Sequence, residues 1–219
     1  MSQSKTIKVT CPFCKKEHEF TVHPSLNVTL DPELKQKVLD RSLFSFTCPD
    51  CQKESPVFYP FLYHDMEKSV MIQFCAREQV EGYKKALQDS CEQAKDLAKV
   101  DMFKDYRYRI VTDLNDLNEK IYLFDAGLDD HVVELAKLSV RFQLKSQHNI
   151  EKLYYQKDRK DDLLLVQSEG KFIGTVPLTK ELYEAYKTYY EERKDTEPFC
   201  IDENWAASLI MQEPEVPKA

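Results

Sequence analysis

Two closely spaced cysteine pairs near the N-terminus constrain the fold more than any other feature of the sequence. They are Cys11-Pro12-Phe13-Cys14 and Cys48-Pro49-Asp50-Cys51. A Cys-x-x-Cys turn brings two sulfurs within reach of one ion, and two such turns supply the four thiolates of a tetrahedral site. The proline presets the backbone dihedral φ that the turn requires. The sequence therefore predicts one structural Zn²⁺ ion, bound by Cys11, Cys14, Cys48 and Cys51.

Three other interpretations of these cysteines are open. An iron centre of the rubredoxin type uses the same four thiolates, so the residues do not distinguish zinc from iron. A redox dithiol needs its first cysteine at a helix N-terminus, whereas residues 15–20 are expected to enter a strand. A chance grouping of core thiols is the third. Because four thiolates fill a tetrahedral shell and leave no position for water, a structural role is favoured.

The spacing and the turn residues both depart from the usual pattern of zinc ribbons. The two pairs are separated by 33 residues, more than the roughly 15–20 that is common. A helix expected over residues 31–40 accounts for the excess as an insertion. Many such turns carry glycine shortly after the second cysteine, where φ is positive. Lys15-Lys16 and Gln52-Lys53 stand there instead.

Local patterns divide the chain into a β-rich N-terminal module and a mixed C-terminal region. Residues 1–75 are predicted to form a zinc-ribbon-like antiparallel β module, with Asp31 and Pro32 marking the start of its inserted helix. Residues 76–212 are predicted to be a mixed region of helices and a three-stranded antiparallel sheet, and residues 213–219 a tail. The fold class is therefore α+β.

The mixed region is expected to begin with a long helix that links it to the first module. The predicted helices lie at residues 77–99, 113–127, 129–138, 180–192 and 202–211. The predicted strands lie at residues 106–112, 150–155, 163–167 and 172–176, the last three of them antiparallel. Thr179 is expected to cap the fourth helix, and Gly127 to end the second.

Charge and composition narrow the class of function. The net charge is −7, and residues 1–75 contain nine basic and nine acidic side chains, so no part offers the basic excess that nucleic-acid binding requires. Only four glycines are present, and no phosphate-binding glycine motif occurs. The N-terminus lacks the apolar segment of a signal peptide, and no membrane helix is expected. Seven cysteines, an odd number, favour a reducing, cytoplasmic location.

The paired turns resemble the bacterial CpXC domain family. The cysteine turns at residues 11–14 and 48–51 carry the resemblance. It extends to residues 109–137, where Leu117-Asn-Glu-Lys-Ile121 and Gly127-Leu-Asp-Asp130 are similar to the segment beyond the cysteine turns in such proteins. The resemblance implies a bacterial protein with a zinc module, and it implies no particular activity.

One acidic cluster offers the only candidate for a catalytic site. Asp129, Asp130, His131 and Glu134 fall within one predicted helix start. Residues three and four apart share a helical face, so a carboxylate–histidine site is one interpretation. An N-cap with acidic residues answering the helix dipole is the other, and it is favoured because no second metal-binding histidine accompanies the group.

Two surface features bear on partners. Lysines 5, 8, 15, 16 and 53 could gather near the first cysteine turn, but interleaved glutamates offset their charge. The predicted helix at 180–192 carries four tyrosines, for which helix packing is favoured over base stacking. The sequence thus favours a non-catalytic, zinc-binding protein-interaction or assembly module. The alternative is a nucleic-acid-binding or regulatory zinc-ribbon protein.

Overall fold

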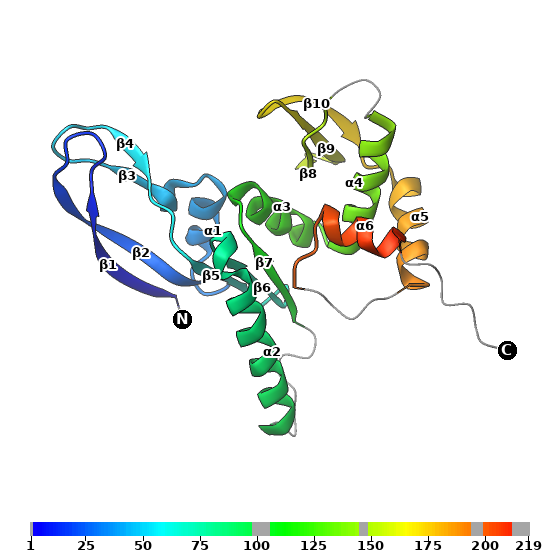
Figure 1. Cartoon of the computed structure of the whole chain (residues 1–219), viewed down its shortest axis with the longest axis horizontal. Coiled ribbons are helices and arrows are strands. Elements are labelled where there is room, and N and C mark those ends of the chain that lie inside the picture. Colours follow the sequence, from blue (N-terminus) through cyan, green and yellow to red (C-terminus); the bar gives the residue numbers. More distant parts are fainter. Residues whose placement is uncertain (1, 98–105, 145–148, 194–198, 212–219) are drawn as a thin grey trace. The chain divides into compact units, whose positions relative to one another are not determined.

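The computed structural model describes residues 2–97, 106–144, 149–193 and 199–211 of the chain (Figure 1). These residues form six α-helices, a five-stranded mixed sheet, and antiparallel sheets of two and three strands, which confirms the predicted α+β class. The chain divides into two compact units, residues 1–118 (unit 1) and 119–219 (unit 2). No helix in the described part is both long and apolar enough to cross a membrane. The expected tail at 213–219 lies outside the described residues.

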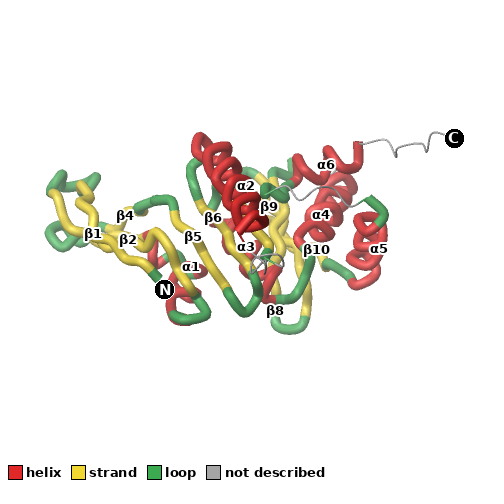
Figure 2. The backbone as a smooth tube through the Cα atoms, turned by 90° about the horizontal axis from the view of Figure 1, so that it is seen from below, coloured by secondary structure: helices red, strands yellow, loops and turns green. Residues whose placement is uncertain are grey.

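Unit 1 is built on a five-stranded sheet in the order β1-β2-β5-β6-β7. Its strands are β1 (Gln3–Thr10), β2 (Glu17–Asn27), β5 (Phe61–Asp65), β6 (Val70–Phe74) and β7 (Arg107–Val111). β1 and β2 form one antiparallel hairpin and β5 and β6 another, whereas β2 pairs with β5 and β6 with β7 in parallel. The sheet is therefore mixed rather than purely antiparallel. Figure 2 shows the two hairpins and the helix that comes after β6.

β7 joins the first sheet, although the expected N-terminal module stops at residue 75. β6 leads through η2 (Arg77–Gln79) into α2 (Val80–Leu97), and β7 then pairs with β6 from Val70↔Arg107 to Phe74↔Val111. Parallel neighbours need a crossover of this kind, because a tight turn cannot join them. The helix expected to link two regions thus connects two strands of unit 1. Its expected last residues, 98 and 99, lie outside the described part.

The insertion between the two cysteine turns contains a helix, as predicted. α1 (Pro32–Leu39) begins with proline and buries Leu34 and Val38. Asp31 was expected to cap it, but that prediction is wrong: its side chain makes no capping hydrogen bond and accepts one from the Ser2 hydroxyl instead. The short η1 (Ser42–Phe44) then leads into the small sheet of β3 (Ser45–Thr47) and β4 (Glu54–Pro56).

Unit 2 packs helices against a three-stranded antiparallel sheet in the order β10-β9-β8. Its elements are α4 (Asp130–Leu144), β8 (Lys152–Asp158), β9 (Asp161–Ser168), β10 (Lys171–Pro177), α5 (Lys180–Glu191) and α6 (Glu203–Met211), and the unit boundary falls within α3 (Leu114–Asp125). Gly127 has a φ of 72° just after α3, the left-handed conformation that glycine adopts most readily. The side chain of Thr179 accepts a hydrogen bond from the N–H of Leu182 at 3.2 Å, so the predicted cap of α5 is confirmed.

The core of unit 2 explains the tyrosine-rich helix. Tyr190 is buried with Trp205, and three further tyrosines of α5 are partly buried against the two core clusters of the unit. Those three are Tyr183, Tyr186 and Tyr189. Their rings contribute to packing, as the sequence favours, and they do not form a free stacking platform.

Candidate metal centre

The two cysteine turns sit at the tips of two hairpins of unit 1. Cys11 and Cys14 come after β1, and Cys48 and Cys51 come after β3. In both turns the N–H of the first cysteine donates to the carbonyl five residues later, and the N–H four residues later donates back to the cysteine carbonyl. These bonds are Cys11–Lys16 (2.9 Å), Lys15–Cys11 (3.0 Å), Cys48–Lys53 (3.0 Å) and Gln52–Cys48 (2.9 Å). The local sequence thus folds the same turn twice.

Each turn places a non-glycine residue in the left-handed region. Lys15 has a φ of 64° and Gln52 a φ of 57°. These are the positions directly after the second cysteine, where glycine is usual in such turns. An L-residue costs roughly 1 kcal/mol more than glycine in this conformation. The closure of the turns therefore holds both residues in an unfavourable backbone geometry.

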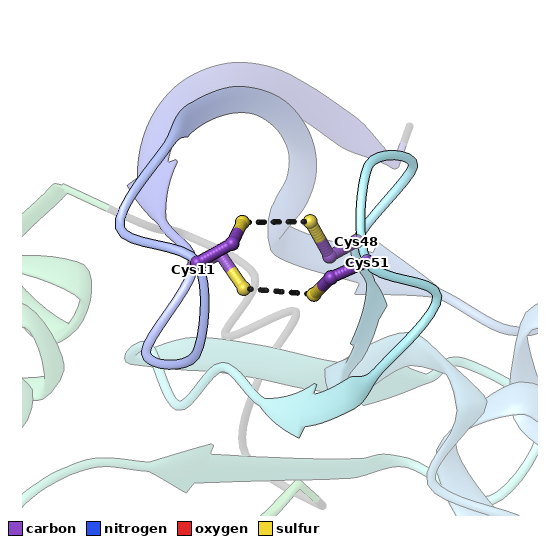
Figure 3. A group of neighbouring side chains, drawn as sticks. Cys11, Cys48 and Cys51 are labelled. Carbon is purple, nitrogen blue, oxygen red and sulfur yellow. Dashed lines mark hydrogen bonds between the residues drawn. The ribbon is translucent and has the colours of Figure 1, made fainter.

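The four sulfurs converge on one point between the hairpins. The Sγ atoms of Cys11 and Cys51 are 3.7 Å apart, those of Cys14 and Cys48 are 3.6 Å apart, and all four lie within 4.8 Å of one another (Figure 3). Four sulfurs at about 2.3 Å from a central ion would be separated by about 3.8 Å along each edge of the tetrahedron. A disulfide would require about 2.05 Å. The cluster can therefore hold one metal ion and is not a pair of disulfides.

The surroundings shield one side of this cluster from water. Cys11 and Cys48 are fully buried with Phe46, and Phe20 packs partly buried against them. Cys14 and Cys51 are intermediate in exposure. This apolar cluster between the two hairpin tips is small, so an ion would add a strong cross-link there.

Electrostatics within the cluster require a cation once the thiols ionise. Hydrogen bonding from the backbone N–H of Cys14 lowers the pKa of Cys11 to about 6. For Cys14 the backbone N–H of Lys16 acts in the same direction, but burial and the neighbouring thiols outweigh it and raise the pKa to about 11. Cys14 therefore keeps its proton at a pH where Cys11 ionises, unless a positive ion lies among the sulfurs. A bound divalent cation reverses this balance, because it stabilises every thiolate at once.

A charged contact beside the cysteines ties the two hairpins together. Lys16 Nζ donates to Asp50 at 2.6 Å, and His18 Nε2 lies 3.0 Å from the other Asp50 oxygen and 3.5 Å from Cys48 Sγ. The hydrogen bond from Lys16 lowers the pKa of Asp50. The His18 ring lies beside Cys48 Sγ, and together with Asp50 it supports the orientation of the second turn.

Comparison with known protein families matches residues 9–137 to the family described as CpXC protein. The chain belongs to the CpXC family. The CpXC match includes both cysteine turns and ends within α4, and the resemblance seen in the sequence is thereby confirmed. No curated protein and no solved structure matched the chain.

The acidic cluster in the last part of the CpXC match is used by the fold. The Asp129 carboxylate accepts a hydrogen bond from the backbone N–H of His131 at 3.0 Å, and this bond is the predicted helix cap. The same carboxylate lies 2.7 Å from His131 Nδ1. Asp130 is fully buried and 2.8 Å from Lys120 Nζ. Asp129, Asp130 and His131 lie close enough to form a candidate metal-binding group, but the helix cap and the Lys120 ion pair account for the two carboxylates. The buried Nε2 of His131 has no hydrogen-bond partner among the described residues.

Glu134 belongs to a buried ion-pair network that links α3 to α4. Lys137 Nζ donates to Glu119 at 2.9 and 3.0 Å and to Glu134 at 2.9 Å. Glu119 also accepts the N–H of Tyr155 at 2.6 Å. Burial lowers the pKa of Lys137, but the two carboxylates outweigh that effect and hold it above its usual range. The network keeps charges paired where water does not reach them.

The remaining cysteines stand apart from the metal cluster. Cys75 is buried and Cys200 is intermediate in exposure, as expected for small apolar residues. Neither belongs to a group of three or more metal-ligating side chains in the described part of the chain. The side-chain environment of Cys91 lies outside the description.

The metal assignment can be tested with one ligand. Cys48→Ser should lose the bound ion and destabilise the hairpins of unit 1 by several kcal/mol, because a structural metal contributes on the order of 10 kcal/mol to small domains. Elemental analysis and Co²⁺–thiolate absorption measure the loss. Cys200→Ser, which removes a thiol from unit 2, should keep one ion per chain. A Cys48→Ser protein with full metal content would contradict the four-cysteine site.

The backbone cost of the second turn can be measured directly. Gln52→Gly should stabilise the metal-loaded protein by roughly 1 kcal/mol relative to Gln52→Ala, because both remove the side chain but only glycine relieves the positive φ. Urea unfolding followed by Co²⁺–thiolate absorption reports the difference. Equal stability of the two variants would show that the left-handed conformation at residue 52 carries no cost.

The buried network predicts a large loss from a single truncation. Lys137→Ala should destabilise unit 2 by about 3–5 kcal/mol, because it leaves the Glu119 carboxylate buried without its ion-pair partner and leaves Glu134 only the longer, 3.6 Å contact with Lys120. Urea unfolding followed by the fluorescence of Trp205, the single tryptophan, measures it. The exposed Lys160→Ala is the control and should change stability little. A Lys137→Ala protein as stable as the control would mean that the network contributes nothing.

Proposed function

We propose that this CpXC protein is a zinc-binding protein-interaction or assembly module. The four-thiolate cluster carries the proposal, since a closed tetrahedral shell leaves no coordination position for water or substrate. Soft thiolate ligands in a tetrahedral arrangement suit zinc, which has no redox chemistry of its own. The ion would then fix the shape of the hairpin tips rather than perform a reaction.

The first cysteine turn offers an aromatic contact for a partner. The ring of Phe13 is 51% exposed between the two cysteines, and Lys53 Nζ lies 4.8 Å from its centroid. Large rigid side chains on a pre-organised turn bind partners with little loss of conformational entropy. A metal that holds the turn would supply that rigidity.

Two measurements test this proposal in sequence. Elemental analysis should find one zinc per chain, and iron in its place would overturn the choice of metal. The zinc-loaded chain should then retain a partner at stoichiometric yield from native lysate, and Phe13→Ala should lose that partner while keeping its zinc. Phe142→Ala, which truncates an exposed phenylalanine of unit 2, is the control. Turnover of a small molecule with no stoichiometric partner would contradict the proposal.

The same exposed ring and lysine are the specific observation in favour of nucleic-acid binding, since aromatic stacking beside a cation suits bases. The charge opposes it, because Lys16 pairs with Asp50 and Lys8 lies 3.9 Å from Glu17. Filter binding over a salt titration separates the two functions. A steep fall of sub-micromolar affinity with salt would favour nucleic acid.

A further inference from the structure

A cavity lies at the carboxyl ends of two parallel strands of unit 1. β6 ends at Phe74 and β7 at Val111, which are paired in register, and the N–H of Cys75 donates to the Val111 carbonyl at 3.1 Å. A cavity of about 420 Å³ opens beside the residues that come after both strands. In open sheets with parallel strands, the crevice beyond the carboxyl ends is where ligands commonly bind. Its size falls within the range of about 300–1,000 Å³ that is usual for small-molecule sites.

The cavity has an apolar wall and a polar rim. Phe58, Tyr59 and Phe74 contribute aromatic rings to its lining, and Arg41, Asp113 and Asn115 contribute polar groups. Phe74 is buried and Tyr59 half-buried, whereas Phe58 is 63% exposed at the cavity. An exposed ring beside a partly buried aromatic surface can close over a planar ligand.

Arg41 brings a positive charge to this rim and makes no ion pair among the described residues. Its guanidinium donates to the Asn115 side-chain oxygen, which is neutral. Asp113 places a carboxylate on the same cavity, where one of its oxygens accepts the N–H of Asn115 at 2.7 Å at the start of α3, so an anionic ligand must bind on the Arg41 side of the rim. A guanidinium fork suits a carboxylate or a phosphate, which it binds through two parallel hydrogen bonds.

The backbone at Arg41 adds to this argument. Arg41 lies just beyond the end of α1 with a φ of 65°, a position where glycine is the residue of lowest energy. The chain nevertheless places a long cationic side chain there. The side chain reaches the cavity across the fold from α1 to the start of α3.

We propose that this cavity binds a small organic anion, with its carboxylate or phosphate group on Arg41 and its aromatic body against Phe58, Tyr59 and Phe74. The site lies apart from the cysteine cluster and goes beyond the proposed interaction function. The ligand is identified by two features together, a planar apolar body and one anionic group.

A matched set of naphthalene compounds tests both features on the metal-loaded chain. We expect 1-naphthyl phosphate or 1-naphthaleneacetate to bind with a Kd below about 1 mM, and the preferred one identifies the anionic group. The neutral 1-naphthalenemethanol should bind at least about tenfold more weakly. Amide shifts in ¹⁵N–¹H spectra should fall on residues 112–115. Binding of neither anion up to about 5 mM, or shifts confined to other residues, would overturn the proposal.

Arg41→Gly gives a variant that should fold normally, because glycine suits the positive φ at this position. It should weaken the preferred anion at least about tenfold and leave the neutral alcohol unchanged. Lys15→Gly is the matched control, since it removes one positive charge at another left-handed residue of unit 1 outside the cavity. Equal affinity in Arg41→Gly and Lys15→Gly would refute the role of Arg41 and, with it, the site.

Discussion

The convergence of four thiols on one point is the constraint on which the architecture of the hairpin tips depends. Four sulfurs within 4.8 Å of one another repel one another when ionised, and a cation among them would offset that repulsion. The two turns approach each other from separate sheets, and a small apolar cluster around Phe46 and the Lys16–Asp50 ion pair accompany the sulfurs. Lys15 and Gln52 are consistent with this constraint. Both adopt a left-handed backbone conformation that is unfavourable for a non-glycine residue but that brings the cysteines together.

Much of the fold could be predicted because its signals are local. The cysteine turns, the glycine after α3, the Thr179 cap and the three strands of unit 2 are each encoded within a few residues. Pairing between distant segments could not be predicted in this way. β7 joins β6 across more than 30 positions, and Asp31 meets Ser2 instead of its own helix, since both outcomes depend on tertiary contacts.

The candidate sites also differ in whether local sequence or distant contacts define them. The four converging cysteines can be predicted from spacing alone, whereas no sequence pattern indicates that Lys120 and Lys137 are buried, because lysines on a helix normally indicate a solvated face. Only the i, i+3 spacing of Glu134 and Lys137 could have suggested an ion pair. Arg41 was also missed, since an arginine after a helix carries no pattern of its own. Its place at the cavity depends on β6 and β7, which pair far from Arg41 in the sequence.

The tie between the two turns has a topological consequence. Cys14 and Cys48 are 34 positions apart, so an ion that joins them encloses α1 in a ring of chain. By the estimate used for covalent bridges, closing such a ring removes about 4 kcal/mol of freedom from the unfolded state. A metal-bound chain would obtain this restraint without an oxidant. The ring would open when the ion is withdrawn, so its state would depend on metal supply rather than on redox potential.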